Sequence, residues 1–255
     1  MATYKKRGGK PTTKAEKEAE IEKDSTTAEV FNTLDEGASR TEAWIEKNQK
    51  ALLGFIGVVA VLVLGYFAYN QYVQGPKEVE AMNEMFQAQE YWEQALTAPA
   101  KDSLYNLSLQ GGEGKYGFID IIDNYSGTNA ANLAHYYAGM AYLSTNKYQE
   151  AIKHLDKFKS KDDVLAPLAK GAIGDAFVQL NQNEDALKYY EEAAKMRENE
   201  FTTPRFLLKA GIAAMALSQN DKALKHFQNI TENYSNSPEA TKAEIYTGRA
   251  DAMKK

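Results

Sequence analysis

The chain has 255 residues, of which 44% are hydrophobic and 25% are charged, with a formal net charge of −5 and no cysteine. The lack of cysteine excludes disulfide bonds, thiolate metal sites and a lipid-bearing cysteine. The acidic balance argues against a nucleic-acid partner, because such a partner requires a basic protein face.

The N-terminal fifth of the chain is polar. Residues 1–26 mix both charges and contain few apolar residues, which predicts a disordered cytoplasmic arm. Residues 27–50 have the pattern of a helix, which we expect to lie along the bilayer surface or on a partner. Within it, Ser39 and Glu42 form a capping box, which predicts a helix start there that leads into the next segment.

Residues 51–69 carry no charge and are almost wholly apolar. At about 1.5 Å of rise per residue they span ~28 Å as a helix, close to the ~30 Å hydrocarbon core of a bilayer. A buried helix of a soluble protein is rarely apolar on every side. The segment therefore predicts a single transmembrane helix.

Basic residues near the helix ends set the predicted orientation. Residues 31–50 hold three basic residues, whereas residues 70–90 hold only Lys77 against four glutamates. Because basic flanks stay in the cytoplasm, we expect a cytoplasmic N-terminus and an exported domain over residues 76–255. The apolar run is too long and begins too late for a cleaved signal peptide. These features predict a single-pass membrane protein with an exported C-terminal domain.

Small residues form one stripe along the predicted membrane helix. They fall within about 80° of one another at 3.6 residues per turn. Such a stripe lets two helix backbones approach closely in lipid, although glycine is also simply common in membrane helices. The predicted packing residues are Gly54, Gly57, Val61, Gly65 and Ala68.

The segment after the membrane is predicted to be a helix followed by an insertion. Gly75 and Pro76 are expected to break the membrane helix, and residues 77–96 to resume it. Residues 98–115 are expected to be irregular. The apolar residues expected on one side of the resumed helix are Val79, Met82, Phe86 and Trp92.

From residue 116 onward the sequence is periodic. Three stretches that begin at Asn146, Asn181 and Ser218 each start as a polar turn and become an amphipathic helix. Small residues recur in step with them, at a period near 34 that resembles the tetratricopeptide repeat. We expect each small residue to mark a close crossing of helix A over helix B. These residues are Gly139, Gly174, Gly211 and Gly248 in helices A, and Ala151, Ala186 and Ala223 in helices B.

Other repeat positions extend the pattern over the whole domain. The large residues of helix B are predicted to be Leu155, Tyr190 and Phe227. Residues 117–125 are expected to be a further helix B, paired with residues 77–96 across the insertion. Residues 237–255 are expected to be a lone final helix that caps the array. The predicted fold class is all-α, with one transmembrane helix followed by a tetratricopeptide-repeat-like α-solenoid.

Candidate chemical sites are few. Gly112, Gly114 and Gly117 fit the spacing of a dinucleotide fingerprint, but that motif requires a preceding strand, so a turn that opens a helix is the better interpretation. His154 and His226 occupy equivalent repeat positions, which indicates surface residues rather than a metal pair. His135 is expected to stand alone on its helix. No nucleophile, base and orienting group cluster in the sequence, so we expect neither an enzyme nor a cofactor or metal.

Stacked helices A line the concave face of such solenoids, which predicts a protein-binding groove. Its aromatic and methionine side chains suit adaptable contacts with extended or unfolded chains. Some of the predicted residues are expected to belong to the core instead. The candidates are Tyr136, Met140, Leu143, Asp175, Val178, Arg205, Leu208, Ile212 and Met215.

The order of these parts resembles the YfgM-type ancillary subunits of the bacterial Sec translocon. The resemblance covers roughly residues 28–255 and rests on the membrane helix at 51–69 and the repeat residues after it. It implies association with the SecYEG channel and with a membrane-anchored periplasmic chaperone of the prolyl-isomerase type. The implied role is to pass newly exported chains to periplasmic folding factors. The resemblance also implies a location in the bacterial inner membrane, with the repeat domain in the periplasm. The predicted transmembrane helix adds membrane lipid as a further partner.

A second hypothesis is an adaptor for envelope assembly or cell division. Such an adaptor would use the same domain to hold folded partners and would not contact translocating chains. The sequence does not separate the two functions, because repeat arrays are generic scaffolds and a fold does not fix a function.

Overall fold

The computed structural model describes residues 26–253, with side chains from residue 41 onward. The predicted disordered arm lies almost entirely outside the described residues. Residues 26–253 are predominantly helical and contain no strand, which confirms the predicted all-α class. The chain divides into two units, Met1–Tyr69 and Asn70–Lys255, and each is described by itself.

The first unit contains one long helix, α2 (Thr26–Tyr69). The predicted helix start at Ser39 is wrong, because the residues before it are already helical and Ser39 continues the same helix. Toward its C-terminal end α2 is long and apolar enough to cross a membrane, and none of its most apolar stretch is buried within the structure. The helix therefore presents an uncovered apolar surface of the length that a bilayer requires.

The second unit begins with a π-helical segment, η1 (Asn70–Gln74), followed by α3 (Gly75–Thr97). The predicted break at Gly75 and Pro76 is wrong. Pro76 lies in the first turn of α3, directly after η1, and its ring nitrogen cannot donate the hydrogen bond that a regular α-helix would make back to the preceding turn. The carbonyl oxygen of Asn70 lies close over Gly75, where an added Cβ would approach it to 3.2 Å. A π-helical turn thus replaces the expected break.

The predicted irregular insertion contains a helix, α4 (Lys101–Gln110), which corrects the expectation for residues 98–115. Tyr105 and Leu109 of α4 are buried in the same core as Met85 of α3. The main partner of α3 is therefore α4, not the predicted 117–125 helix. That helix, α5 (Phe118–Asn124), packs chiefly on the helix that follows it.

The glycine cluster between α4 and α5 is a turn, as predicted. Gly111 and Gly114 have φ of 78° and 75°, a conformation that glycine adopts readily. Gly117 is the N-cap of α5, and its backbone N–H donates to Asp120 Oδ2 at 2.9 Å. Because a helix and not a strand precedes this turn, the structural context of a dinucleotide site is missing.

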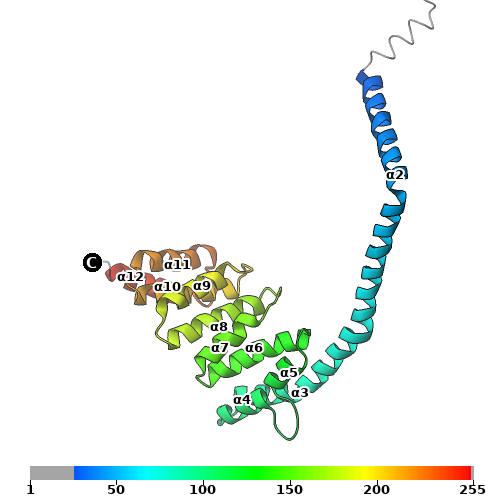
Figure 1. The fold of residues 1–255 in the computed structure, drawn as a ribbon. Helices are drawn as coiled ribbons and strands as arrows, with labels where there is room; N and C mark the ends of the chain where they lie inside the picture. The colour runs from blue at the N-terminus through cyan, green and yellow to red at the C-terminus, as the bar shows by residue number, and fades with distance from the viewer. Residues whose placement is uncertain (1–25, 254–255) are drawn as a thin grey trace, which may run out of the picture. The chain divides into compact units, whose positions relative to one another are not determined.

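The remaining helices stack in chain order as a solenoid (Figure 1). Each helix packs mainly against its neighbours along the chain, as in tandem repeats of paired helices. Helices A of the repeats are α6 (Asn129–Ser144), α8 (Leu165–Gln179) and α10 (Thr202–Ala216); helices B are α7 (Tyr148–Lys157), α9 (Asn183–Lys195) and α11 (Asn220–Asn233); the last helix is α12 (Ala240–Ala252).

The repeat glycines lie at close helix crossings, as the sequence predicts. A Cβ added at Gly139 would lie 2.5 Å from Leu155 Cγ, and one at Gly174 would lie 2.6 Å from Tyr190 Cε1. Gly211 meets Phe227 in the same way. Gly248 has open space around it, because no helix B follows α12 within residues 41–253.

The alanines of helices B confirm the register of the repeat. Ala151, Ala186 and Ala223 are fully buried.

Sequence reasoning missed one further crossing, where the ring of Phe206 in α10 fills the space over Gly171 in α8. The core therefore depends on small residues that admit large side chains from two directions.

The turns between helix A and helix B share a left-handed residue. Asn146, Asn181 and Ser218 have φ of 61°, 58° and 58° and each follows the end of a helix A. Glycine or asparagine usually occupies such a position, because other side chains crowd the backbone there. Ser218 is therefore the least suited of the three residues.

We expect Ser218→Gly to stabilise the repeat array by about 0.5–1 kcal/mol, because relief of the left-handed strain outweighs the added freedom of the unfolded chain. Urea unfolding of the chain in detergent micelles measures the change. Ser235→Gly is the control, since Ser235 is exposed and has no positive φ. A loss of stability in both variants would contradict the assigned strain.

Candidate protein-binding site

The predicted groove residues lie on α6, α8 and α10, the three helices A, but they differ in exposure. Val178, Arg205 and Ile212 are exposed, and Leu208 is buried in the core of the last repeats. Leu208 therefore offers little surface to a partner. The half-buried members are Tyr136, Met140, Leu143, Asp175 and Met215.

Three of the predicted groove residues line one open hollow of about 370 Å³. Leu143 of α6 and Val178 of α8 contribute apolar side chains, and Asp175 contributes a carboxylate. Sequence reasoning missed the other lining residues, which come from the turn after α6, the start of α7, the end of α8 and from α9. They are Asn146, Tyr148, Gln179 and Tyr190.

The carboxylate of Asp175 already has hydrogen-bond partners within the protein. Tyr190 Oη donates to Asp175 Oδ1 at 2.6 Å, and Lys209 Nζ donates to the two carboxylate oxygens at 2.5 and 2.7 Å. Burial, together with the neighbouring Asp175 carboxylate, raises the pKa of Tyr190, so its hydroxyl stays protonated. The pair with Lys209 joins α8 to α10 and neutralises the carboxylate. An incoming segment therefore meets little net charge at this point.

The polar groups of the hollow that remain near its rim are amides and a phenol. Tyr148 Oη donates to Asn146 Oδ1 at 2.8 Å and lies 3.5 Å from Gln179 Oε1. Amide side chains both donate and accept hydrogen bonds, so they match the backbone of an extended peptide. With Leu143 and Val178 beside them, the hollow suits one apolar side chain and its flanking peptide groups.

Two other predicted groove residues, Tyr136 and Met140, do not line this hollow. The ring of Tyr136 lies 5.2 Å from that of Phe158 and 5.8 Å from that of Tyr137, measured between centroids. Tyr136 and Met140 both pack on a core cluster that contains Leu155. Their apolar surface is largely used in this packing.

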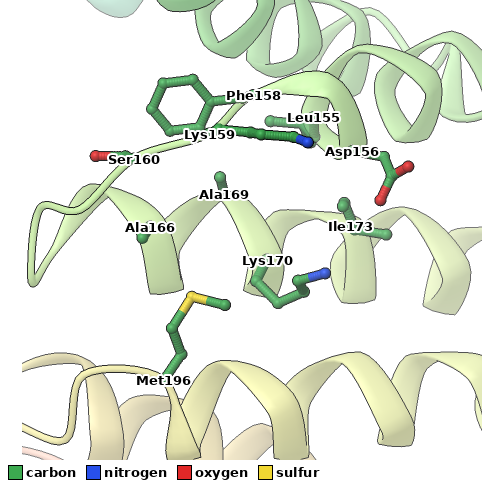
Figure 2. Close-up of a pocket in the computed structure, with 10 residues that line it drawn as sticks. All are labelled: Leu155, Asp156, Phe158, Lys159, Ser160, Ala166, Ala169, Lys170, Ile173 and Met196. Carbon is green, nitrogen blue, oxygen red and sulfur yellow. The ribbon is translucent and has the colours of Figure 1, made fainter. Parts of the chain in front are cut away.

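A second hollow of about 280 Å³ lies where the end of α7 and the following loop meet α8 (Figure 2). Its apolar lining includes Phe158, Ile173 and Met196, and Lys159 and Lys170 add charge. Lys170 Nζ lies 3.5 Å from Glu192 Oε2 and is thus already paired. The hollow is smaller than most ligand pockets, so it gives no argument for a small-molecule site.

The histidines are placed differently from the prediction. His135 does not stand alone, because its Nδ1 lies 3.1 Å from Nδ1 of His154 between α6 and α7. His226 Nε2 lies 2.9 Å from Glu191 Oε1, which Lys222 also contacts at 2.8 Å. All three imidazoles are half-buried. Residues 41–253 hold no group of three or more His, Asp and Glu side chains suited to a metal ion.

The small-residue stripe on α2 has no neighbour within the described residues. An added Cβ at Gly54, Gly57 or Gly65 would have no atom within 4 Å, and Val61 and Ala68 are exposed. The stripe is therefore free to contact another helix or lipid.

Comparison with protein families identifies the repeats. One tetratricopeptide-repeat family profile matches residues 172–238, and a second matches residues 133–162. No characterised protein sequence matches the chain significantly. The chain therefore contains tetratricopeptide repeats, which are protein-interaction modules, over α6–α11. No enzyme family is indicated.

Proposed function

We propose that the protein is a membrane-anchored scaffold that holds newly exported chains at the Sec translocon and passes them to periplasmic chaperones. The observation that carries this proposal is the union, in one chain, of an uncovered apolar helix and a repeat array with an open hollow on its helices A. Repeat arrays of this kind act by binding other proteins.

The anchor in this proposal is the C-terminal part of α2, at residues 51–69. Its side chains are exposed almost throughout, and exposed apolar surface of this extent in water would be costly. Because residues 31–50 hold three basic residues and residues 70–90 hold only Lys77, the N-terminus is assigned to the cytoplasm. The repeat array then lies on the periplasmic side of the inner membrane.

The proposed partners are the SecYEG channel and a membrane-anchored prolyl-isomerase-type chaperone. The resemblance to the YfgM-type subunits supplies their identity. The free stripe on α2 supports a contact with a partner helix in the membrane, because small residues allow close approach of two backbones. The hollow beside Leu143 and Val178 supports capture of an extended client segment.

A photo-reactive amino acid placed at Val178 of the full-length chain tests the proposal in bacterial cells. Val178 is exposed and lines the hollow, so we expect cross-links to nascent exported chains when translocation is arrested. The same group at Lys188, an exposed position on helix B α9, is the matched control and should give few such products.

Other cross-linking results would contradict the proposal. Cross-links from Val178 only to folded envelope or division proteins, unaffected by the arrest of translocation, would favour the adaptor function. Equal yields of client products from Val178 and Lys188 would show that the groove assignment is wrong.

A further inference from the structure

Helix α3 leaves an apolar stripe uncovered at the N-terminal end of the array. One face of the helix is buried, through Ala81, Met85, Ala88 and Ala95. Trp92, predicted to share a side with Val79, Met82 and Phe86, packs with this buried face instead. The exposed fractions on the other face are 62% for Val79, 44% for Met82, 61% for Phe86 and 57% for Leu96.

Such a stripe is unusual at the end of a repeat array. Terminal repeats normally present a polar outer face, because no further repeat covers them. Here the outer face of α3 carries a valine, a methionine and a phenylalanine in succession. A surface of this kind marks an interaction site when its residues are contiguous.

The spacing of the exposed residues is that of a coiled coil. Val79, Met82 and Phe86 are separated by three and four residues, and the same count continues to Gln89, Glu93 and Leu96. Apolar residues that alternate by three and four occupy the a and d positions of a heptad, along which two helices pack with knobs in holes. The core-facing residues Met85 and Ala88 fall outside these positions, so one helix serves both contacts.

We propose that two copies of this chain associate through α3, with their α3 helices parallel. A parallel heptad pairing places each of Val79, Met82 and Phe86 opposite the same residue of the second copy. Beside Val79 lies an open hollow, lined in part by Pro76 and Asn83, that is able to receive a side chain of the facing helix. The parallel direction rests on the proposed function, because two copies anchored in one membrane enter α3 with the same polarity.

We call the row of a and d positions from Val79 to Leu96 the seam. It is short, which limits the strength of the dimer. Gln89 and Glu93 interrupt it, and two Glu93 carboxylates facing each other would repel. Two factors offset this limit. The repeat core already holds α3 helical, and anchoring in one membrane raises the effective concentration of the two helices. The expected association is therefore strong in the membrane and weak for dilute molecules.

Disulfide trapping tests the proposal, because the natural chain contains no cysteine. Met82→Cys is introduced into the full-length chain, which is reconstituted in lipid vesicles and mildly oxidised. Its Cα should lie within the ~4.4–6.8 Å of its counterpart that a disulfide requires. We expect mostly cross-linked dimers. Gln94→Cys, on the same helix and exposed but off the seam, is the control and should remain monomeric.

A second variant separates the seam from chance collisions. Phe86→Glu added to Met82→Cys should remove most of the cross-linking without changing the melting temperature, since Phe86 is exposed in the single chain. Monomers at Met82→Cys, equal trapping at Gln94→Cys, or trapping that Phe86→Glu leaves unchanged would each overturn the proposal. Client capture at Val178 does not require the dimer, so the two proposals fail independently.

Discussion

The Ala186→Arg chain will lose the cooperative unfolding of its repeat array or will unfold at a far lower urea concentration than the parent. Ala186 is fully buried in α9, which packs against both α8 and α10. Overpacking alone costs about 1–3 kcal/mol, and an unpaired buried guanidinium adds several more. The sum approaches the ~5–15 kcal/mol by which a domain is normally stable.

The matched control is Ala216→Arg. Ala216 is the last residue of α10 and is exposed, so an arginine there remains in water and favourably near the C-terminal end of the helix. We expect its urea midpoint to stay close to that of the parent chain. If Ala186→Arg unfolded at the same urea concentration as Ala216→Arg, Ala186 would not lie at a close crossing of α8, α9 and α10.

The sequence specifies the crossings well because sterics allow few solutions there. A glycine on helix A and a large residue on helix B, repeated at one period, have a single physical interpretation, and Gly174 against Tyr190 shows it. The first repeat was harder to predict. Helix α4 is only ten residues long and ends in a glycine-rich turn, so its pattern resembles an insertion. Its pairing with α3 depends on tertiary packing around Met85.

The candidate site was partly predictable for a related reason. Repeat register indicates which residues face the concave side, and this placed Leu143, Asp175 and Val178 around one hollow. The repeat register does not indicate which of those side chains already has a partner within the protein. Lys209, 34 residues away, neutralises Asp175, and the stacking of α10 beside α8 brings the two together. The contact between His135 and His154 escaped prediction in the same way.

The histidine pair makes the array sensitive to acid. Burial lowers the pKa of His135, and burial together with the facing His135 lowers the pKa of His154 to about 4. Lys153 and Lys157 lower the pKa of His154 further, and the Asp123 carboxylate opposes them weakly. In the unfolded chain both imidazoles return to a pKa near 6.5.

The sign of the effect follows from proton uptake. Above about pH 6.5 the imidazoles of His135 and His154 are neutral in both the folded and the unfolded chain, so the pair does not alter the stability. As the pH falls toward 4, the unfolded chain binds protons that the folded array excludes, so folding becomes less favourable. Solvent reaches both rings, which reduces the effect below that of the full pKa shift. The stability lost to His154 is then on the order of 1–2 kcal/mol between pH 7 and pH 4.5.

Comparison with His154→Gln isolates this contribution. Glutamine remains neutral and keeps a hydrogen-bonding group near His135, so the variant should lose less stability on acidification than the parent. Urea unfolding of both chains in detergent micelles at pH 7 and pH 4.5 measures the difference, since acid effects at carboxylates are common to both. Equal losses in the two chains would mean that His154 titrates in the folded array as it does in water. The half-buried contact of His135 with His154 makes the opposite result the expected one.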